Sequence, residues 1–159
     1  PINPLYWGGG QEKGLRPGTL PVPLIIGFAK ALELAQRDMD KYKKSLCDLR
    51  NQLWHGLRAE LPNLILNGSM KHRLPHNLNF TVPGVRGNQL QQSLRSLINC
   101  SSASACSNGV PSHVLRALGR TKQEAEASIR LSLGKETSIM DIKDALKVIV
   151  EVVSQLRKK

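Results

Sequence analysis

A chain of 159 residues, of which 40% are hydrophobic, is long enough for one globular domain with an appended segment. Its apolar runs are too short to cross a bilayer and no secretory signal opens it, so we expect no membrane partner. Three cysteines, at positions 47, 100 and 106, lack the C-x-x-C spacing of a metal site, which favours a reduced, cytoplasmic setting and no bound metal.

The formal net charge of +11 leaves the kind of partner open. Lysines and arginines are scattered among acidic residues, and only two Tyr, two Trp and two Phe could stack on bases, which disfavours nucleic acid. A solvated surface and a basic face for an acidic protein both remain compatible with this charge.

Residues 1–19 are rich in glycine and proline, so we expect an irregular segment. Thr19 is the expected N-cap of the helix that follows. From 20 to 61 apolar residues recur at alternating threes and fours, which predicts one long helix that Pro62 ends. Such a helix is longer than a compact domain needs, so we expect it to bridge two bodies or to bend. A coiled-coil dimer is the alternative.

The pattern of residues 62–159 predicts an α+β domain, with helices packed on a small, mostly antiparallel sheet. Alternation and short apolar runs indicate strands, and apolar stripes of period three to four indicate helices. The expected strands are 64–66, 76–82, one that ends at 99–100, and 129–133; the expected helices are 88–97, 111–118, and one after a capping box at 138–141. In the strand at 129–133, Arg130 lies on the face opposite the inward apolar residues.

Residues 99–113 form the stretch most suited to chemistry. They are mostly small and polar, which predicts a surface loop rather than core. Cys106 lies between Ala105 and Ser107, so little shields its sulfur, and a helix start near Pro111 would lower the pKa of the thiol. A structural cysteine in a loop is the alternative interpretation.

Three motifs, in this order, resemble those of NifS/IscS-type cysteine desulfurases. These are class V aminotransferase relatives of fold type I that use pyridoxal 5'-phosphate (PLP). The motifs are GGGQEKGLRPGT at 8–19, similar to the family's Gly-rich segment; SSASACSNGVPSHVLRALG at 101–119, similar to its active-cysteine loop; and SIRLSLG at 128–134, similar to its carboxylate-binding strand. The resemblance covers almost the whole chain.

The resemblance implies a role for three residues. Cys106 would attack the sulfur of L-cysteine and carry it as a persulfide, leaving L-alanine. Arg130 would bind the substrate carboxylate through two parallel hydrogen bonds, where a surface ion pair is the ordinary alternative. Thr19 would reach the PLP phosphate of a neighbouring subunit, which implies a homodimer. The sulfur acceptor would be a protein such as an iron–sulfur scaffold.

The family's Schiff-base lysine lies in a His-Lys pair upstream of the Gly-rich motif, and this sequence has no such pair there. We therefore expect a C-terminal part that is inactive alone, with a cofactor-domain segment at 1–19, a linking helix at 20–61 and a small domain at 62–159. The connection at 107–110 is shorter than in typical IscS-like members, which reduces the reach of the loop. A selenocysteine lyase-type enzyme and a non-catalytic basic α+β binding module are the alternatives.

Overall fold

A computed structural model describes residues 2–101 and 111–158. The chain divides into two compact units, residues 1–39 and 40–159. The first unit contains a short 3-10 helix, η1 (Gln11–Gly14), and the start of helix α1 (Val22–Glu60), which continues into the second unit. The long helix predicted over 20–61 is therefore confirmed to within two residues at each end. The domain limits that we predicted from the motifs stay a prediction.

The start of α1 corrects one expectation. Its first helical residue is Val22, and the carbonyl of Pro21 accepts hydrogen bonds from the N–H groups of Leu24 and Ile25. The prediction that Thr19 caps this helix is wrong, because a cap side chain must stand directly before the first helical residue. Pro21 occupies that position, and Leu20 lies between it and Thr19.

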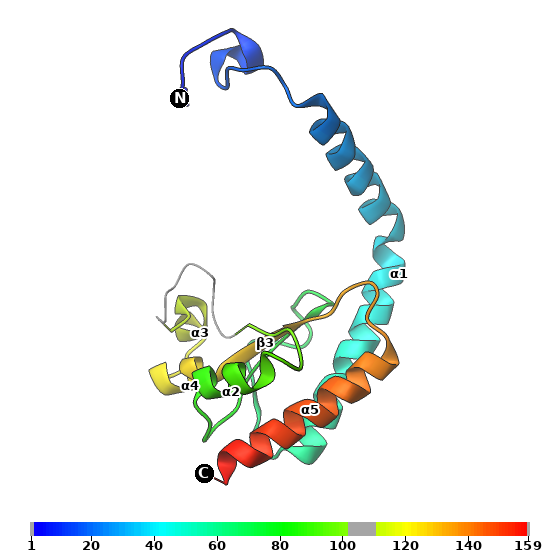
Figure 1. Ribbon diagram of the computed structural model, residues 1–159, viewed down its shortest axis with the longest axis vertical. Coiled ribbons are helices and arrows are strands. Elements are labelled where there is room, and N and C mark those ends of the chain that lie inside the picture. Colours follow the sequence, from blue (N-terminus) through cyan, green and yellow to red (C-terminus); the bar gives the residue numbers. More distant parts are fainter. Residues whose placement is uncertain (1, 102–110, 159) are drawn as a thin grey trace. The chain divides into compact units, whose positions relative to one another are not determined.

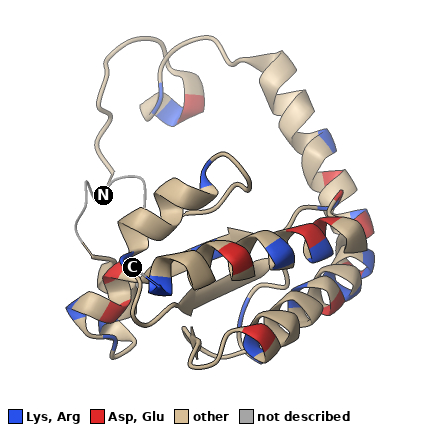
Figure 2. Ribbon diagram, turned by 60° about the horizontal axis from the view of Figure 1, so that its bottom comes forward, with Lys and Arg blue, Asp and Glu red and all other residues tan. Residues whose placement is uncertain are grey.

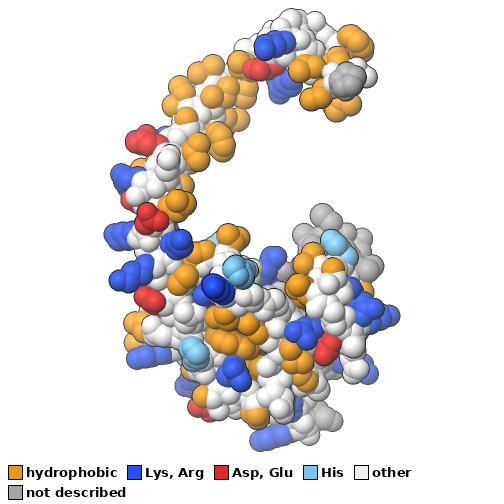
Figure 3. Space-filling view, turned by 180° about the vertical axis from the view of Figure 1, so that it is seen from behind, with side chains coloured by type: hydrophobic (Ala, Val, Ile, Leu, Met, Phe, Trp, Pro, Cys, Tyr) orange, Lys and Arg blue, Asp and Glu red, His pale blue; other side chains and the backbone are white. Residues whose placement is uncertain are grey.

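Apolar residues recur along all of α1, but their burial changes along it. In the first unit Leu24 is 72% exposed and Phe28 is 71% exposed, and Figure 3 shows apolar side chains on the surface of this stretch. In the second unit Leu53 and Leu57 are 2% and 0% exposed. Among the described residues, the buried positions of α1 thus lie between Leu49 and Leu57, in the second unit.

A three-stranded antiparallel sheet lies at the centre of the second unit (Figure 1). Its strands are β1 (Ile65–Leu66), β2 (Asn77–Thr81) and β3 (Ser128–Ser132), with β2 in the middle. Ser101 extends the sheet beyond β3 through a single antiparallel bridge to Arg130. The predicted α+β class and the strands at 64–66, 76–82 and 129–133 are confirmed, and the strand expected to end at 99–100 is reduced to this bridge.

Within the described residues the second unit contains four further helices: α2 (Gly87–Leu94), α3 (His113–Ala117), α4 (Lys122–Glu126) and α5 (Ile139–Arg157). The predicted capping box at 138–141 is present at the start of α5. Helix α4 was not predicted. Its five residues are too few to display an apolar stripe, but a second capping box, formed by Thr121 and Glu124, starts it.

One face of the sheet packs into the core. Phe80 and Ile129 are fully buried on this face, and the ring of Phe80 lies 5.9 Å from that of Trp54 on α1. Helices α1 and α5 run side by side in the second unit, where Gly56 admits the side chain of Leu146 (Figure 1). These contacts hold the sheet from one side and leave its other face for polar residues.

Charged side chains are distributed over the helices rather than gathered. Figure 2 shows lysines and arginines interspersed with acidic residues, as the sequence indicated. Among the described residues, the ion pairs connect exposed or half-exposed groups close in sequence. Such pairs contribute little to stability. No helix of the described residues is long and apolar enough to span a membrane.

Candidate functional site

On β2 and β3, the face of the sheet opposite the core carries polar residues. Antiparallel pairing places Thr81 opposite Ser128, Asn79 opposite Arg130, and Asn77 opposite Ser132. Because directly paired residues share a face, the alternating polar positions of β2 and β3 meet in one polar surface. At one end of it Thr81 and Ser128 are buried; further along, Arg130 and Ser132 are exposed.

Arg130 stands on this face with an exposed side chain. Among the residues that the structure describes, no hydrogen bond or ion pair involves its guanidinium. The other arginines near the sheet differ: Arg50 donates to the carbonyl of Leu74, and Arg120 donates to the carbonyl of Leu66. The alternative interpretation of Arg130 was a surface ion pair, but in the described part of the chain no carboxylate pairs with this arginine. Its donors remain available for a carboxylate ligand.

Arg130 is tied through its backbone to the start of the cysteine loop. The N–H of Ser101 donates to the carbonyl of Arg130 at 3.0 Å, and the N–H of Arg130 donates back at 2.6 Å. Ser101 is also the last described residue before the segment 102–110. Cys106, the predicted nucleophile, lies in that segment and so outside the described residues.

A buried amide organises the closed end of the polar face. Asn67, 4% exposed, donates from Nδ2 to Asn79 Oδ1 at 2.7 Å, and to Thr81 Oγ1 and Ser128 Oγ, each at 3.1 Å. Its Oδ1 accepts from Arg120 Nε at 2.7 Å. These five residues, Asn67, Asn79, Thr81, Ser128 and Arg120, form the Asn67 network, which links β1, β2, β3 and the α3–α4 connection. A network with its buried groups satisfied holds those elements in one arrangement.

Cys100 and Cys47 are free thiols, both half-buried. Cys100 packs against the edge of the core, and burial raises the pKa of its thiol. A thiol held in its protonated form is a poor nucleophile, because the thiolate is the reactive species. Of the two cysteines in the stretch 99–113, Cys100 therefore suits a structural role.

Thr19, the predicted phosphate contact, belongs to the first unit. It is exposed, and within the described residues its hydroxyl makes no hydrogen bond. It follows Gly18, whose φ of 108° is a conformation that glycine adopts most easily. A free hydroxyl beside a glycine turn is chemically suited to a phosphate oxygen, so the donor available here fits the group that the resemblance implies.

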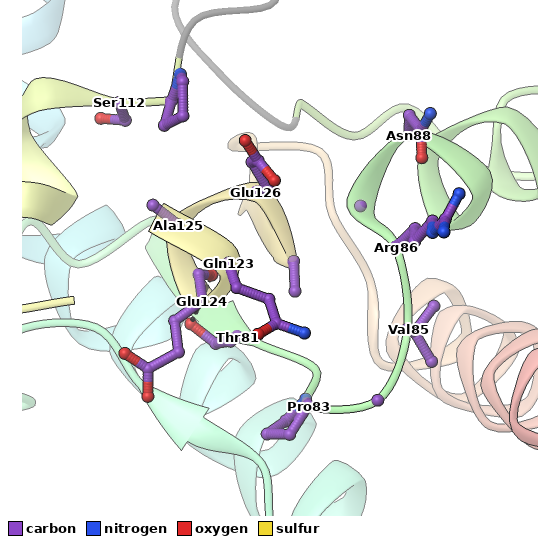
Figure 4. A pocket seen from close by; sticks show the side chains of 14 residues that line it. Thr81, Pro83, Val85, Arg86, Asn88, Ser112, Gln123, Glu124, Ala125 and Glu126 are labelled. Carbon is purple, nitrogen blue, oxygen red and sulfur yellow. Dashed lines mark hydrogen bonds between the residues drawn. The ribbon is translucent and has the colours of Figure 1, made fainter. Parts of the chain in front are cut away.

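A cavity of about 920 Å³ lies beside the start of α2 and the end of α4 (Figure 4). Arg86 and Asn88 lie on one side of it, with Gln123 and Glu126 from α4 across from them. Arg130 is not among the residues that line it. We therefore locate the candidate site on the open polar face of the sheet, where the unengaged guanidinium lies.

Sequence reasoning identified Arg130 but missed the residues around it. Asn67 was part of an expected turn, and Asn79 was one of several polar residues on an alternating strand. Arg120 had no distinguishing signal, because its partner Asn67 lies 53 positions away. The signal that could have found Asn79 is the polar alternation of two strands, but only the register of β2 and β3 places Asn79 against Arg130.

Comparison with known proteins identifies the family of the chain. The model of the family described as aminotransferase class-V matches residues 6–145. Cysteine desulfurase IscS of Photorhabdus laumondii is 41% identical over 152 residues, covering 94% of this chain and 37% of that relative. A mitosomal cysteine desulfurase of Trachipleistophora hominis is 41% identical over 160 residues, covering 97% of this chain and 36% of that relative.

Solved structures give the same result. A protein titled NifS-like matches with a TM-score of 0.85 and 36% identity, over 98% of this chain and 40% of that one. The chain thus spans somewhat more than a third of the length of the curated relatives, 37% and 36% for the two named above. By sequence over nearly its whole length, and by fold, this chain belongs to the aminotransferase class-V family, and its neighbours there are NifS-like enzymes of fold type I.

Proposed function

We propose that this chain is the part of a PLP-dependent cysteine desulfurase that holds the substrate carboxylate and accepts the substrate sulfur. The observation that carries the proposal is the position of Arg130. Its guanidinium is exposed and unengaged within the described residues, while its backbone is bonded to Ser101. The names of the relatives, cysteine desulfurases, support the same reaction.

Covalent geometry supports pairing Arg130 with Cys106. Cys106 follows Ser101 by five positions, and bond lengths limit a chain of five residues to about 18 Å. Since Ser101 is bonded to Arg130, this limit is compatible with a Cys106 sulfur that reaches an amino acid whose carboxylate Arg130 binds. A substrate the size of cysteine would then lie between a fixed cation and a thiol in reach.

The proposed reaction is balanced without a further oxidant. The Cys106 thiolate attacks the sulfur of L-cysteine, an S–S bond forms, and the C–S bond of the substrate breaks. The bonding electrons stay with the substrate carbon, which takes a proton and becomes L-alanine, while Cys106 holds the persulfide. PLP, when bound, supplies the electron sink that makes this cleavage possible.

The contribution of this chain to holding PLP is the Thr19 hydroxyl, which would donate to the phosphate. The 159 residues contain no His-Lys pair, the pair in which the resemblance places the cofactor lysine. We therefore propose that the chain acts together with a cofactor-binding part, as a homodimer, and is inactive alone. An acceptor protein, such as an iron–sulfur scaffold, would take the sulfur from Cys106.

The proposal is tested in the PLP-loaded protein that contains this chain. Replacement of Cys106 by Ala should reduce alanine formation from L-cysteine to background and remove the persulfide, detected as a 32 Da mass increase (approximately the mass of one sulfur atom) on the tryptic peptide. Cys100→Ala is the matched control, because it removes the half-buried thiol from the same 99–113 stretch. Unchanged alanine formation by the Cys106 variant, or loss of activity only in the Cys100 variant, would refute the assignment.

A further inference from the structure

The side chains of Asn79 and Arg130 lie close together on the exposed part of the polar face. Both N–H and C=O of Arg130 bond to Ser101, on the edge away from β2. Asn79 and Arg130 are therefore a non-hydrogen-bonded pair of the β2–β3 ladder. In such pairs the Cα atoms are only about 4.5 Å apart and the side chains are closer than in hydrogen-bonded pairs.

The Asn67 network determines which way the Asn79 amide points. Arg120 is only a donor, so the Asn67 atom that faces it at 2.7 Å must be Oδ1. The other amide atom of Asn67, Nδ2, then faces Asn79, which must present its Oδ1, at 2.7 Å. One cation thus fixes the orientation of two amides in succession.

This orientation leaves the Asn79 amide nitrogen directed away from β1. Asn67 follows β1, Asn79 lies on the central strand and Arg130 lies on β3. Because the oxygen and nitrogen of a planar amide diverge, an oxygen aimed toward β1 turns the nitrogen toward the β3 side. Within the described residues Asn79 Nδ2 donates to no acceptor, although the side chain is half-buried.

We propose that Asn79 is a second carboxylate-binding residue, which donates from Nδ2 to the same substrate carboxylate that Arg130 binds. This inference rests on the proposed function. A carboxylate has about four acceptor positions, of which a bidentate guanidinium occupies two. A neutral donor beside the guanidinium supplies a third bond without repelling the cation. Asn67 and Arg120 are positioning residues, because they act only through the orientation of Asn79.

The test is Asn79→Asp in the PLP-loaded protein that contains this chain. Aspartate keeps an oxygen for Asn67 but replaces the donor with a negative charge, so KM for L-cysteine should rise about tenfold to a hundredfold, with a smaller change in kcat. Asn79→Ala should give a smaller rise in KM. Asn77→Asp is the matched control: it has the same chemistry on the same face but lies opposite Ser132, and KM should change less than about twofold.

Cysteamine, which is L-cysteine without the carboxylate, separates binding from folding. The wild-type preference for L-cysteine over cysteamine, measured by competition, should shrink in both Asn79 variants, whereas misfolding would weaken both ligands equally. Arg120→Met should reduce the preference for L-cysteine in part. Arg120→Lys, which again offers a donor to Asn67, should restore this preference.

The outcomes distinguish this inference from the proposed function. Suppose that Arg130→Gln loses the preference for L-cysteine over cysteamine, whereas the Asn79 variants keep it or bind both ligands equally more weakly. Asn79 is then not a carboxylate ligand, and the proposed function stands. If Arg130→Gln also keeps the preference, the carboxylate site itself is wrong and both proposals fall.

Discussion

The two faces of the β1–β2–β3 sheet come from the same strands but differ in their side chains and in their burial. On one face Phe80 and Ile129 are fully buried against helices of the same chain. On the other face Thr81 and Ser128 are buried in the Asn67 network, whereas Arg130, two residues after Ser128, is exposed with its guanidinium unengaged within the described residues. The two residues are two positions apart on β3. The Ser128 hydroxyl has its hydrogen bonds made within the protein, whereas the Arg130 guanidinium is available to bind a ligand.

The difference between the two faces indicates which side chains of this domain can bind a ligand. Burial of apolar side chains supplies stability, and a buried polar group must have its hydrogen bonds made within the protein. A charged group that the fold places on a rigid strand, without a partner, contributes to neither purpose. Such a group is the natural candidate for ligand binding, and the following changes test this distinction.

The largest effect on stability should come from the apolar face. Phe80→Ala removes a fully buried ring that packs on Trp54, and should lower the free energy of unfolding by about 3–5 kcal/mol. Ser132→Ala, on the exposed polar face, should stay within about 0.5 kcal/mol of wild type. Urea unfolding of the 159-residue chain, followed by near-UV circular dichroism, measures both. Equal losses for the two variants would contradict the division between the faces.

The reverse pattern is expected at Arg130, where activity should change and stability should not. In the PLP-loaded protein that contains this chain, Arg130→Gln should lower kcat/KM for L-cysteine by about two to three orders of magnitude, because two charge-assisted hydrogen bonds are lost. Arg130→Lys should recover only part, since an ammonium group cannot bind in the bidentate geometry. Arg95→Gln, an exposed arginine outside the sheet, is the control. A fall in melting temperature with unchanged kcat/KM would identify Arg130 as structural.

Gly87, the first residue of α2, should tolerate no larger side chain. A Cβ at Gly87 would lie 1.7 Å from the carbonyl oxygen of Glu126, so α2 and the residues before β3 would have to separate. Gly87→Ala should lower the free energy of unfolding by about 1–3 kcal/mol in the same urea experiment. Gly134→Ala provides the contrast, because its Cβ would meet only Thr137 Oγ1, at 4.0 Å. An unchanged unfolding midpoint for Gly87→Ala would show that this contact is loose.

The smallest effect concerns the caps of α4 and α5. The backbone N–H of Ser138 donates to the Asp141 carboxylate and, with the Ser138 hydroxyl, lowers the pKa of that carboxyl below its usual value of 3.8. Thr121 lowers the pKa of Glu124 in the same way. A carboxyl whose pKa is lower in the folded state stabilises the fold above its unfolded pKa, and this stabilisation disappears as the pH falls through the folded pKa.

Asp141→Asn should therefore flatten the dependence of unfolding midpoint on pH below about pH 4, where wild type loses stability. Urea midpoints between about pH 5 and pH 3 measure this slope. Asp144→Asn, on the same helix but outside the capping box, should leave the slope close to that of wild type. Identical slopes for the two variants would mean that the cap has no role in acid stability.

Local rules predicted most elements because the signals for them lie within a few residues. The apolar stripe predicted α1, strict alternation predicted β2 and β3, and the Ser138 capping box located the start of α5. The rules failed where the deciding contact was not local or the element was short. Helix α4, with five residues, is too short to show an apolar stripe. Helix α1 begins at Val22 rather than directly after Thr19, because Leu20 and Pro21 lie between them.

The sequence alone determined the fold class, the polar faces of β2 and β3, and the choice of Arg130 as the candidate carboxylate anchor. Only the tertiary structure decided that Arg130 is unengaged, that its backbone is bonded to Ser101, and that Asn79 lies beside it. The physical reason is that propensity and alternation depend on neighbours along the chain, whereas strand register and hydrogen-bond partners depend on residues tens of positions away. The Asn67–Arg120 pair, 53 residues apart, is the clearest example.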